Sequence, residues 1–334
     1  MALLGILIIE KNGSNYLKLI LDNLTSLSNF NWSLIDIYFY DDNSTDDSVK
    51  ILNEIKKTLP IKVISGKYND GLMHARLELM KICNDDFIIL MDVDDTLSKN
   101  TFSAFLNSYK NHDLLMLKRK YIGSNHEKVF SNSYNENKSF LDNILTNVRL
   151  QFITGMFLKR NIYKEIVKIL EKKDIHNIFI AEDITPNLIA ISLAKEPCFL
   201  DAYYNYFLTN SSSITNWSTR EADKLKWNKR SYENNKKVFY LIQEIIKNNE
   251  IKGEVANSLA FISSIRLLFS MRISTNQDDE KTAVKKISME YFSNGYKCKL
   301  CWQDWIRKKI INNDFFMKLY LFVEQSIKSK NKIF

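Results

Sequence analysis

Phe87-Ile-Ile-Leu-Met-Asp-Val-Asp-Asp95 is a continuous apolar run that ends in three carboxylates. A run without polar interruption is typical of a strand that is covered on both faces of a sheet. Ligands of open α/β sheets bind just outside the carboxyl ends of the strands, where Asp92, Asp94 and Asp95 would then lie. The stretch therefore predicts a central strand with an acidic site at its end.

Strands and helices alternate on both sides of this run. Apolar segments of strand length lie at residues 3–9, 34–40, 61–65, 114–117, 153–158 and 198–206. Helical patterns lie at residues 16–27, 48–57, 72–82 and 161–171. Such alternation is the signature of βαβ units and a mostly parallel sheet. We therefore expect an α/β domain over residues 1–216.

The sequence changes character after about Trp217, where strand signals stop. Long helical patterns cover approximately residues 220–247, 255–271 and 280–292. The last stretch, from Leu300, mixes aromatic and basic residues, as does a helix that packs on its parent domain or lies at a membrane surface. We expect residues 217–334 to form a helical C-terminal region with a role on the acceptor side of the site, in an oligomer or at a membrane.

Composition excludes a disordered chain, because 45% of the residues are hydrophobic and 26% are charged. The formal net charge of +8 can reflect a phosphate-bearing ligand, an anionic membrane surface or a lysine-rich background, and the sequence leaves these alternatives open. A concentrated basic face with interleaved aromatic residues is not evident outside the C-terminal stretch. We therefore expect no nucleic-acid partner.

Targeting signals are not evident in the sequence. The opening apolar run, residues 3–9, is short and lacks a basic flank, and no stretch approaches the ~20 apolar residues of a membrane-spanning helix. The four cysteines are scattered, which suits a reducing compartment. We expect a cytoplasmic protein, and we leave open a peripheral contact with the inner face of the cell membrane and a homo-oligomeric state.

A second acidic pair, Asp41-Asp42, ends the strand expected at residues 34–40. The carboxyl ends of parallel strands meet at one edge of a sheet, so both acidic clusters should lie at that edge. An Asp-x-Asp at a strand end suits a hard divalent cation, Mn²⁺ or Mg²⁺, because it leaves positions open for water and phosphate oxygens. Such a cation can neutralise the charge on a departing diphosphate.

Several motifs, in order over about the first 215 residues, resemble those of glycosyltransferase family 2, whose fold is GT-A. The matching segments are Asn12 after the first strand, Asp41-Asp-Asn-Ser-Thr-Asp-Asp-Ser48, Asn69-Asp-Gly71 with Ala75-Arg76, Asp92-Val93-Asp94, Thr154-Gly155, Glu182-Asp183, and Tyr204 through Thr215. The fold that this resemblance implies is a GT-A nucleotide-diphospho-sugar transferase fold followed by a helical C-terminal region.

The resemblance also implies roles for individual residues. Asp94 would bind the metal and Asp183 would be the general base. The nucleotide-sugar would be bound by Asn12, Asp41, Asp42, Asn69, Gly71, Arg76, Asp92, Val93, Thr154, Gly155 and Glu182. We further hypothesise that the Glu182 carboxylate raises the proton affinity of its neighbour Asp183.

The activity implied by the resemblance is transfer of a sugar from a nucleotide-sugar, with inversion at the anomeric carbon. The expected donor is a UDP-hexose or a UDP-N-acetylhexosamine. The expected acceptor is a hydroxyl group on a bacterial capsule or other surface polysaccharide, a glycolipid or a glycoprotein glycan. Phe207 stands where the family usually has an arginine, and no histidine lies between Tyr204 and Thr215.

Two other readings remain open at the level of sequence. Residues 88–97 also fit the strand end of haloacid-dehalogenase-type phosphatases, in which Asp92 would be the nucleophile and Asp94 the acid. That motif normally opens its domain, whereas here three strand-like segments precede it. The other alternative is a non-catalytic glycosyltransferase-like subunit.

Overall fold

The computed structural model describes residues 2–67, 70–122, 128–132, 134–146, 152–179, 182–207 and 224–274. Contacts along the chain divide it into two units. The first unit comprises Met1–Ile144 and Arg149–Asp223, and the second comprises Leu145–Val148 and Lys224–Phe334. The domain boundary predicted between residues 216 and 217 falls outside the described residues and stays a prediction.

A single sheet organises the first unit. Its described strands are β1 (Leu4–Glu10), β2 (Ile35–Asp41), β3 (Ile61–Ser65), β4 (Phe87–Asp92), β5 (Thr96–Leu97), β6 (Leu114–Ile122), β7 (Lys128–Asn132), β8 (Met156–Lys159) and β9 (Pro197–Phe207). They are ordered β3-β2-β1-β4-β8-β6-β9-β5, and β7 pairs with β6.

Strand directions confirm a mostly parallel sheet. β3, β2, β1 and β4 are parallel neighbours. β8 is antiparallel to both β4 and β6, so β6 runs in the direction of β4, and β9 is parallel to β6. β5 and β7 are short antiparallel additions, to β9 and β6. Two of these elements, β5 and β7, were not predicted from the sequence.

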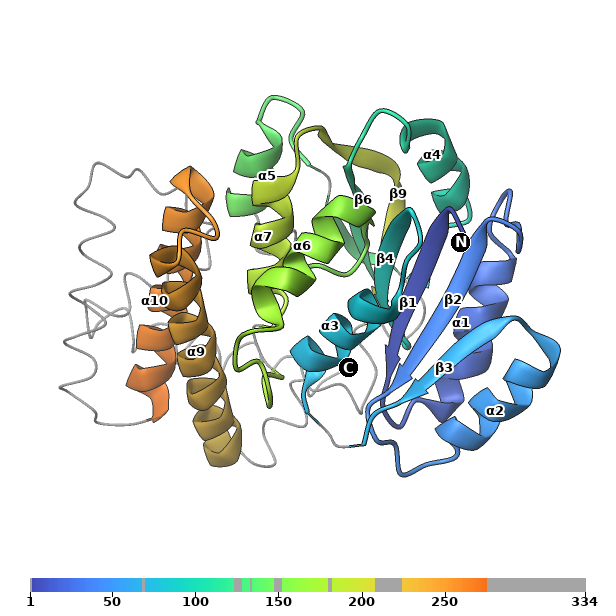
Figure 1. The fold of residues 1–334 in the computed structure, drawn as a ribbon, viewed down its shortest axis with the longest axis horizontal. Helices are drawn as coiled ribbons and strands as arrows, with labels where there is room; N and C mark the ends of the chain where they lie inside the picture. Colours follow the sequence, from blue (N-terminus) through green and yellow to red (C-terminus); the bar gives the residue numbers. More distant parts are fainter. Residues whose placement is uncertain are drawn as a thin grey trace. The chain divides into compact units, whose positions relative to one another are not determined.

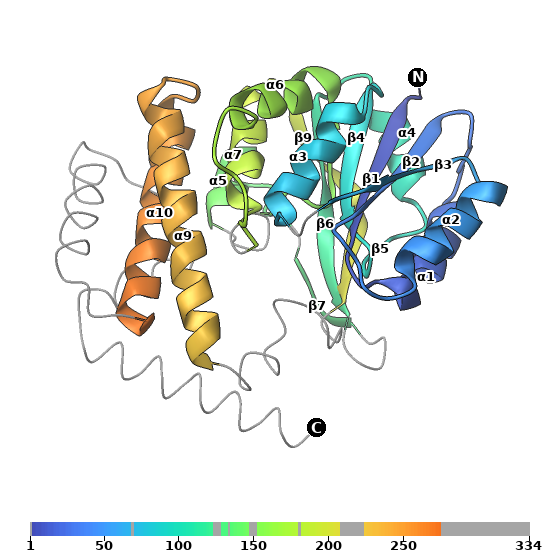
Figure 2. The same cartoon turned by 60° about the horizontal axis from the view of Figure 1, so that its bottom comes forward.

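Helices cover both faces of the sheet (Figures 1 and 2). One face carries α1, α2 and α4, and the other carries α3, α6 and α7. The bounds of the helices in this unit are α1 Ser14–Thr25, α2 Ser48–Thr58, α3 Leu72–Ile82, α4 Thr101–Ser108, α5 Phe140–Thr146, α6 Arg160–Leu170 and α7 Ile184–Leu193. Two covered faces explain why all seven residues of β1 are buried.

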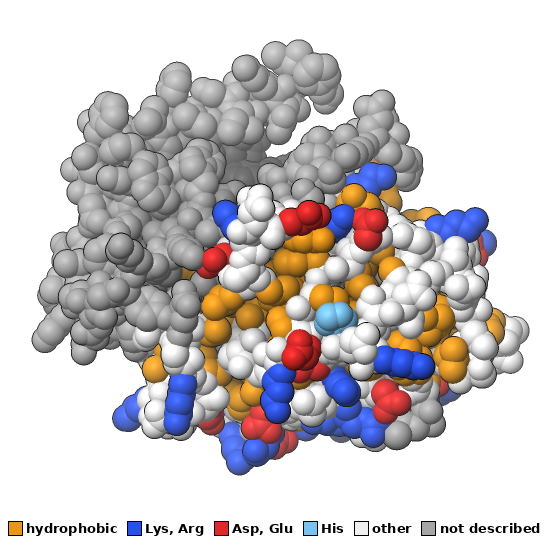
Figure 3. Space-filling model, turned by 90° about the horizontal axis from the view of Figure 1, so that it is seen from above, with side chains coloured by type: hydrophobic (Ala, Val, Ile, Leu, Met, Phe, Trp, Pro, Cys, Tyr) orange, Lys and Arg blue, Asp and Glu red, His pale blue; other side chains and the backbone are white. Residues whose placement is uncertain are grey.

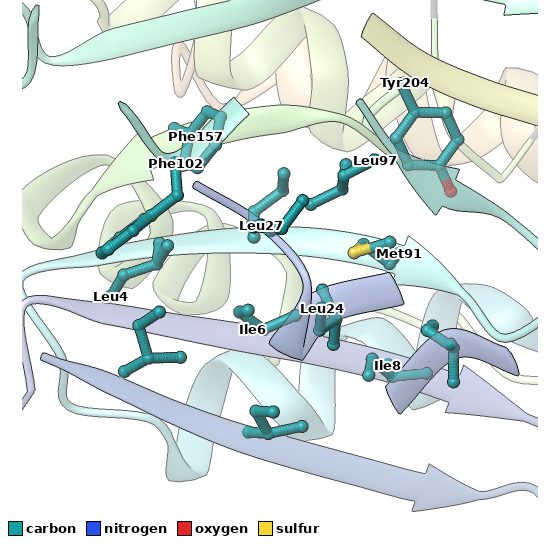
Figure 4. Packing of buried hydrophobic residues seen from close by; sticks show 14 of the residues in the cluster. Leu4, Ile6, Ile8, Leu24, Leu27, Met91, Leu97, Phe102, Phe157 and Tyr204 are labelled. Atoms are coloured by element: carbon teal, nitrogen blue, oxygen red, sulfur yellow. The ribbon is translucent and has the colours of Figure 1, made fainter. Parts of the chain in front are cut away.

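The core between the sheet and α1 shows the alternation of a strand directly. Leu4, Ile6 and Ile8 of β1 lie in one cluster with Leu24 of α1 and Phe102 of α4 (Figure 4). Successive side chains of a strand point to opposite faces, so the intervening residues of β1 serve the other layer. Burial of each such side chain contributes about 1.5–3 kcal/mol.

Charged side chains are interspersed on the described surface in Figure 3, where basic and acidic groups surround hydrophobic ones. The positive charge of the chain is therefore not gathered into one patch on that visible face. No helix in the part of the chain that the structure describes is long and apolar enough to cross a membrane.

Two helices are described in the second unit. α9 (Lys224–Lys247) and α10 (Gly253–Ser274) pack against each other, and they confirm the helical patterns predicted at residues 220–247 and 255–271. Phe239, Ile242 and Leu259 are among the residues buried there. The helix expected at 280–292, the stretch from Leu300 onward and two of the cysteines lie outside the described residues.

Candidate active site

The two predicted acidic clusters lie at the same edge of the sheet. Parallel pairing sets Glu10, at the end of β1, opposite Asp41 of β2, and sets Ile9 opposite Asp92 of β4. β1 lies between the two acidic strand ends. The rule that sites form at the carboxyl ends of parallel strands therefore placed both clusters correctly.

Glu10 is a buried carboxyl group that the sequence analysis missed. It accepts hydrogen bonds from the Ser44 hydroxyl at 2.9 Å and the Gly13 amide at 3.1 Å. Burial, together with a hydrogen bond to Asp41, raises the pKa of Glu10 to about 7. Glu10 thus keeps its proton to nearly neutral pH. The strand-end rule that found Asp41 would also have found Glu10.

Asn12 braces the loop after β1 against the loop after β2. Its backbone adopts a positive φ of 52°, and its side-chain oxygen accepts a hydrogen bond from the Thr45 amide at 2.7 Å. The Asn12 amide donates to the Ser44 hydroxyl at 2.8 Å, and the Asp46 carboxylate accepts from the Ser14 amide at 3.1 Å. These hydrogen bonds fix the two loops that lie next to Asp41 and Asp42.

Asp42 is a fully buried carboxylate at this edge of the sheet. It is 1% exposed, and within the described residues no donor stands in good hydrogen-bond geometry to either carboxylate oxygen, although the Asp70 backbone amide is near enough to favour the charged form. Burial raises its pKa to about 6; Lys11 opposes the shift, and the charges of Asp70 and Asp41 add to it. A buried acceptor without a donor is costly, and a ligand that supplies an N–H or O–H group would remove that cost.

Gly71 lies against the protein's own backbone. Its φ is 103°, and an added Cβ would come within 2.8 Å of the Ile178 nitrogen and oxygen. Glycine is required here for both reasons, positive φ and close approach. The contact holds the start of α3 against the segment between α6 and α7. Asn69, the other predicted residue of this motif, lies outside the described residues.

Arg76 of α3 is buried and faces three carboxylates. One guanidinium nitrogen lies 3.0 Å from Glu182 Oε1 and 2.9 Å from Asp183 Oδ1, and the other lies 3.2 Å from Asp92 Oδ1. Burial lowers the pKa of Arg76, but the charges of Asp183, Asp92 and Glu182 outweigh that effect and raise it. The structure thus brings three of the predicted residues together around a fourth, the cation Arg76.

Asp183 and Glu182 precede α7 directly, and both are buried. Burial raises the pKa of Asp183; Asp92 adds to the shift, whereas Arg76 and Arg119 oppose it. Burial and then the charge of Asp183 raise the pKa of Glu182 to about 8. The pKa of Asp183 is therefore raised as expected, but burial is its main cause, and the repulsion within the pair acts on Glu182.

Arg119 of β6 is a second buried cation that sequence reasoning missed. It donates to the carbonyl oxygens of Phe152 and Thr154 and lies 5.3 Å from the centre of the Tyr204 ring. Gly155, with a φ of 74°, packs so closely on Tyr204 that an added Cβ would come within 2.9 Å of its ring. The segment that contains Thr154 and Gly155 is therefore held between β6 and β9.

The hydroxyl group of Tyr204 anchors the Asp92–Asp95 turn. The Asp92 amide donates to the Tyr204 hydroxyl at 3.2 Å, and the Tyr204 hydroxyl also bonds to the Asp95 carboxyl group. Val93 packs against Gly13 at the start of α1, where an added Cβ would come within 2.8 Å of Val93 Cγ1. Tyr204 and β5 were needed to position this turn, and only the packing reveals them.

The residues of this turn fit a divalent cation. Asp95 is buried, and burial followed by the charges of Asp94 and Asp92 raises its pKa well above the usual value. Asp94 is half-buried, and its charge adds to the burial that raises the pKa of Tyr16. A hard cation held by carboxylate oxygens would relieve this crowding of like charges.

Comparison with protein families places these residues in a known context. Residues 6–167 match the family model described as glycosyl transferase family 2. Residues 6–167 are thus a glycosyl transferase family 2 domain. The chain is therefore a glycosyltransferase, and the dehalogenase-type phosphatase reading of residues 88–97 is rejected. Comparison with curated protein sequences gave no significant match.

Solved glycosyltransferase structures share the fold. TarS 1–349 of S. aureus aligns with a TM-score of 0.56 and 17% identity, over 87% of this chain and 89% of that chain. The complex of TarS 1–349 with UDP-GlcNAc gives 0.53 and 16% identity, over 89% and 93%. The mannosyltransferase PcManGT of Pyrobaculum calidifontis, in complex with GDP-Man and Mn²⁺, gives 0.50 and 9% identity, over 87% and 82%. These alignments confirm the GT-A fold.

Replacing Gly71 by alanine should destabilise the protein more than the same change at Gly253. Both glycines have positive φ, 103° and 70°, but only at Gly71 would the new Cβ meet described backbone, at 2.8 Å. We expect Gly253→Ala to cost about 1–2 kcal/mol from φ alone, and Gly71→Ala to cost about 1–3 kcal/mol more from the clash. Urea unfolding measures both, and equal losses would contradict the contact.

Replacing Glu182 by glutamine should flatten the pH dependence of stability. The pKa of Glu182 is about 8 in the folded protein against a usual 4.5. The folded state therefore keeps a proton that the unfolded chain releases, and stability falls as the pH rises through this window. The neutral Glu182→Gln side chain should remove a decline on the order of 1–3 kcal/mol.

Urea unfolding at pH 5.5, 6.5 and 8 tests this expectation. The matched control is Glu54→Gln, which changes an exposed carboxylate paired with Lys57 and should leave the pH dependence as in the wild type. If Glu182→Gln also retains the wild-type pH dependence, the Glu182 side chain does not hold the proton.

Proposed function

We propose that this glycosyltransferase moves a sugar from a UDP-sugar to an acceptor hydroxyl group, with inversion of the anomeric carbon. The observation that carries the proposal is the buried Asp42 carboxylate, which has no donor in good hydrogen-bond geometry among the described residues and lies at the same sheet edge as the Asp92–Asp94 turn. An acceptor of N–H bonds beside a cation-binding turn matches the two ends of a nucleoside diphosphate. The donors in the neighbouring complexes, UDP-GlcNAc and GDP-Man, have that chemistry.

In this proposal Asp42 recognises the nucleobase or ribose. Its pKa of about 6 leaves the carboxylate mostly ionised at neutral pH, so it can accept an N–H or O–H bond. Asn12 and the Glu10–Asp41 pair shape the surrounding loops. Uracil presents an N–H donor to such a group, and we take UDP-N-acetylhexosamines and UDP-hexoses as the donors to test first.

A divalent cation, Mn²⁺ or Mg²⁺, would be held by Asp94 with Asp92 beside it. Bound there, it would supply Lewis-acid stabilisation of the charge that develops on the leaving diphosphate. The crowded carboxylates of the turn support this assignment, because their repulsion adds to the burial that raises the pKa of Asp95.

Asp183 is the proposed general base. It takes the proton of the acceptor hydroxyl as the new C–O bond forms at the anomeric carbon and the bond to the diphosphate oxygen breaks. This single displacement passes through an oxocarbenium-like transition state. Arg76 and Arg119 hold Asp183 in place electrostatically, and the burial that raises its pKa makes it a stronger base than an exposed aspartate.

The proposed acceptor is a hydroxyl group of a capsule or other surface polysaccharide, a glycolipid or a glycoprotein glycan. The family assignment supports a glycan acceptor as a class. The helical C-terminal region is the proposed place for acceptor, oligomer or membrane contacts, because the α/β domain already provides the donor side.

Donor hydrolysis or transfer should require a metal ion, Asp94 and Asp183. Nucleotide release should be measured for UDP-GlcNAc, UDP-glucose, UDP-galactose and GDP-mannose with Mn²⁺ or Mg²⁺ and with EDTA. We expect Asp94→Asn to abolish nucleotide release, whether or not Mn²⁺ or Mg²⁺ is present. Asp183→Asn should lower kcat about 10²–10⁴-fold, the usual contribution of a general base, with little change in donor affinity.

Asp22→Asn is the matched control, because Asp22 is an exposed partner of Lys18 on α1 and should leave turnover unchanged. Full turnover in EDTA would overturn the metal assignment. Wild-type kcat in Asp183→Asn would overturn the assignment of the base.

A further inference from the structure

Three metal-ligand side chains meet beside the start of α3, outside the Asp92–Asp95 turn. Asp70 precedes the helix, His74 lies in its first turn, and His176 comes from the segment between α6 and α7. One ligand atom from each lies within 4.8 Å of the other two. Two of the three residues are histidines, which are rare here, since the whole chain has four.

The three side chains converge without bonding to one another. The Nδ1 atoms of His74 and His176 lie 4.0 Å and 3.8 Å from the two oxygens of Asp70, which is beyond hydrogen-bond distance. Ligands about 2.0–2.2 Å from one metal stand roughly 3.3–3.6 Å apart in a tetrahedral site. The two measured distances to Asp70 exceed this spacing by about half an ångström, so small shifts of the side chains would bring Asp70 to ligand distance from both histidines.

His74 supports this arrangement on its own. Its Nδ1 atom is buried and has no hydrogen-bond partner in the described residues. A buried ring nitrogen normally has a partner, and a metal ion would supply one. The His74 and His176 rings lie 4.7 Å apart at 30°, so the two imidazoles are direct neighbours.

The surroundings favour a cation. Besides Asp70, the carboxylates of Asp42 and Glu78 make this region negative. Burial and then the charges of these carboxylates raise the pKa of the nearby Tyr40 to about 12. Lys81 is the basic group that acts on His74 from the next turns of α3. Solvent can reach the site, because the His176 side chain is 51% exposed.

We propose that Asp70, His74 and His176 form a binding site for a transition-metal ion of the Zn²⁺ class. Two imidazoles and one carboxylate are ligands typical of Zn²⁺ and its neighbours, whereas Mg²⁺ prefers oxygen ligands alone. Three protein ligands leave a position for water. The site is distinct from the proposed Mn²⁺ or Mg²⁺ site, because it includes none of the carboxylates of the Asp92–Asp95 turn.

A metal ion there would tie α3 to the segment that leads into Asp183. His74 is two residues before Arg76, and His176 is two residues before Ile178, the backbone neighbour of Gly71. The ion would therefore reinforce the crossing that sets Arg76 against Glu182 and Asp183. We expect metal binding to raise thermal stability, since it stabilises only the folded state.

The experiment uses the full chain without a polyhistidine tag. Zn²⁺ content is measured by mass spectrometry after equilibrium dialysis, Co²⁺ binding by visible absorption, and Tm with and without Zn²⁺. We expect one Zn²⁺ per chain and a Tm that rises on its addition. His74→Ala and His176→Gln should each weaken Zn²⁺ binding about a hundredfold or more and remove the Tm shift.

His112→Ala is the matched control, because His112 is a partly exposed histidine outside the cluster and should leave Zn²⁺ binding unchanged. Asp94→Asn should also keep Zn²⁺ binding, which separates this site from the one proposed for catalysis. His176→Gln changes an exposed side chain, so it tests the site even if His74→Ala does not fold.

Three results would overturn the proposal. They are no Zn²⁺ in the wild-type protein, undiminished binding in both histidine variants, and binding that is lost in Asp94→Asn alone. None of these bears on the metal dependence of donor turnover, which is measured separately.

Discussion

The buried guanidinium of Arg76 is the interaction on which the arrangement of the site depends. It meets Asp92 from β4 together with Glu182 and Asp183 from the start of α7. A buried charge is tolerated only with partners in good geometry, so α3, β4 and α7 are held in one relation by a strict electrostatic requirement. Gly71 supports the same arrangement sterically, since it lets α3 start directly against the backbone of Ile178.

Carboxylates outnumber the buried cations at this edge of the sheet, and protons take up part of the difference. The pKa values of Glu182, Glu10 and Asp42 rise to about 8, 7 and 6, in each case chiefly because burial disfavours the charged form. A site in this condition is ready for positive charge and for hydrogen-bond donors. The chemistry of a cation with a nucleoside diphosphate sugar meets both needs, and the glycosyl transferase family 2 match of residues 6–167 agrees with it.

The second half of the sheet holds the groups that complete this edge. Arg119 on β6 and Tyr204 on β9 are buried, and between them they hold Thr154, Gly155 and the Asp92 amide. The charge of Arg119 also acts on Asp183. Precise placement of Asp183 thus depends on strands that contribute no proposed catalytic side chain of their own.

The sequence by itself determined the layers of the fold and the edge where the site lies. Hydrophobic periodicity predicted β3 and α3 with their observed bounds, because a local repeat tells which face of an element is buried. The sequence also placed aspartates at the ends of β2 and β4, because it predicted both of these strands. Among the described elements, the short β5 and β7 and the helices α4, α5 and α7 lacked a usable pattern, since they are brief or buried all round.

Which side chains become partners was decided only by the tertiary structure. Arg76 and Glu182 are 106 residues apart in the chain, and their contact exists because the packed core brings α3 and α7 together. The proton on Glu10, the role of Arg119 and the meeting of His74 with His176 likewise arise from burial and from crossings of distant segments. A local repeat assigns a side chain to a face, but its partner and its protonation depend on which other segment closes over that face.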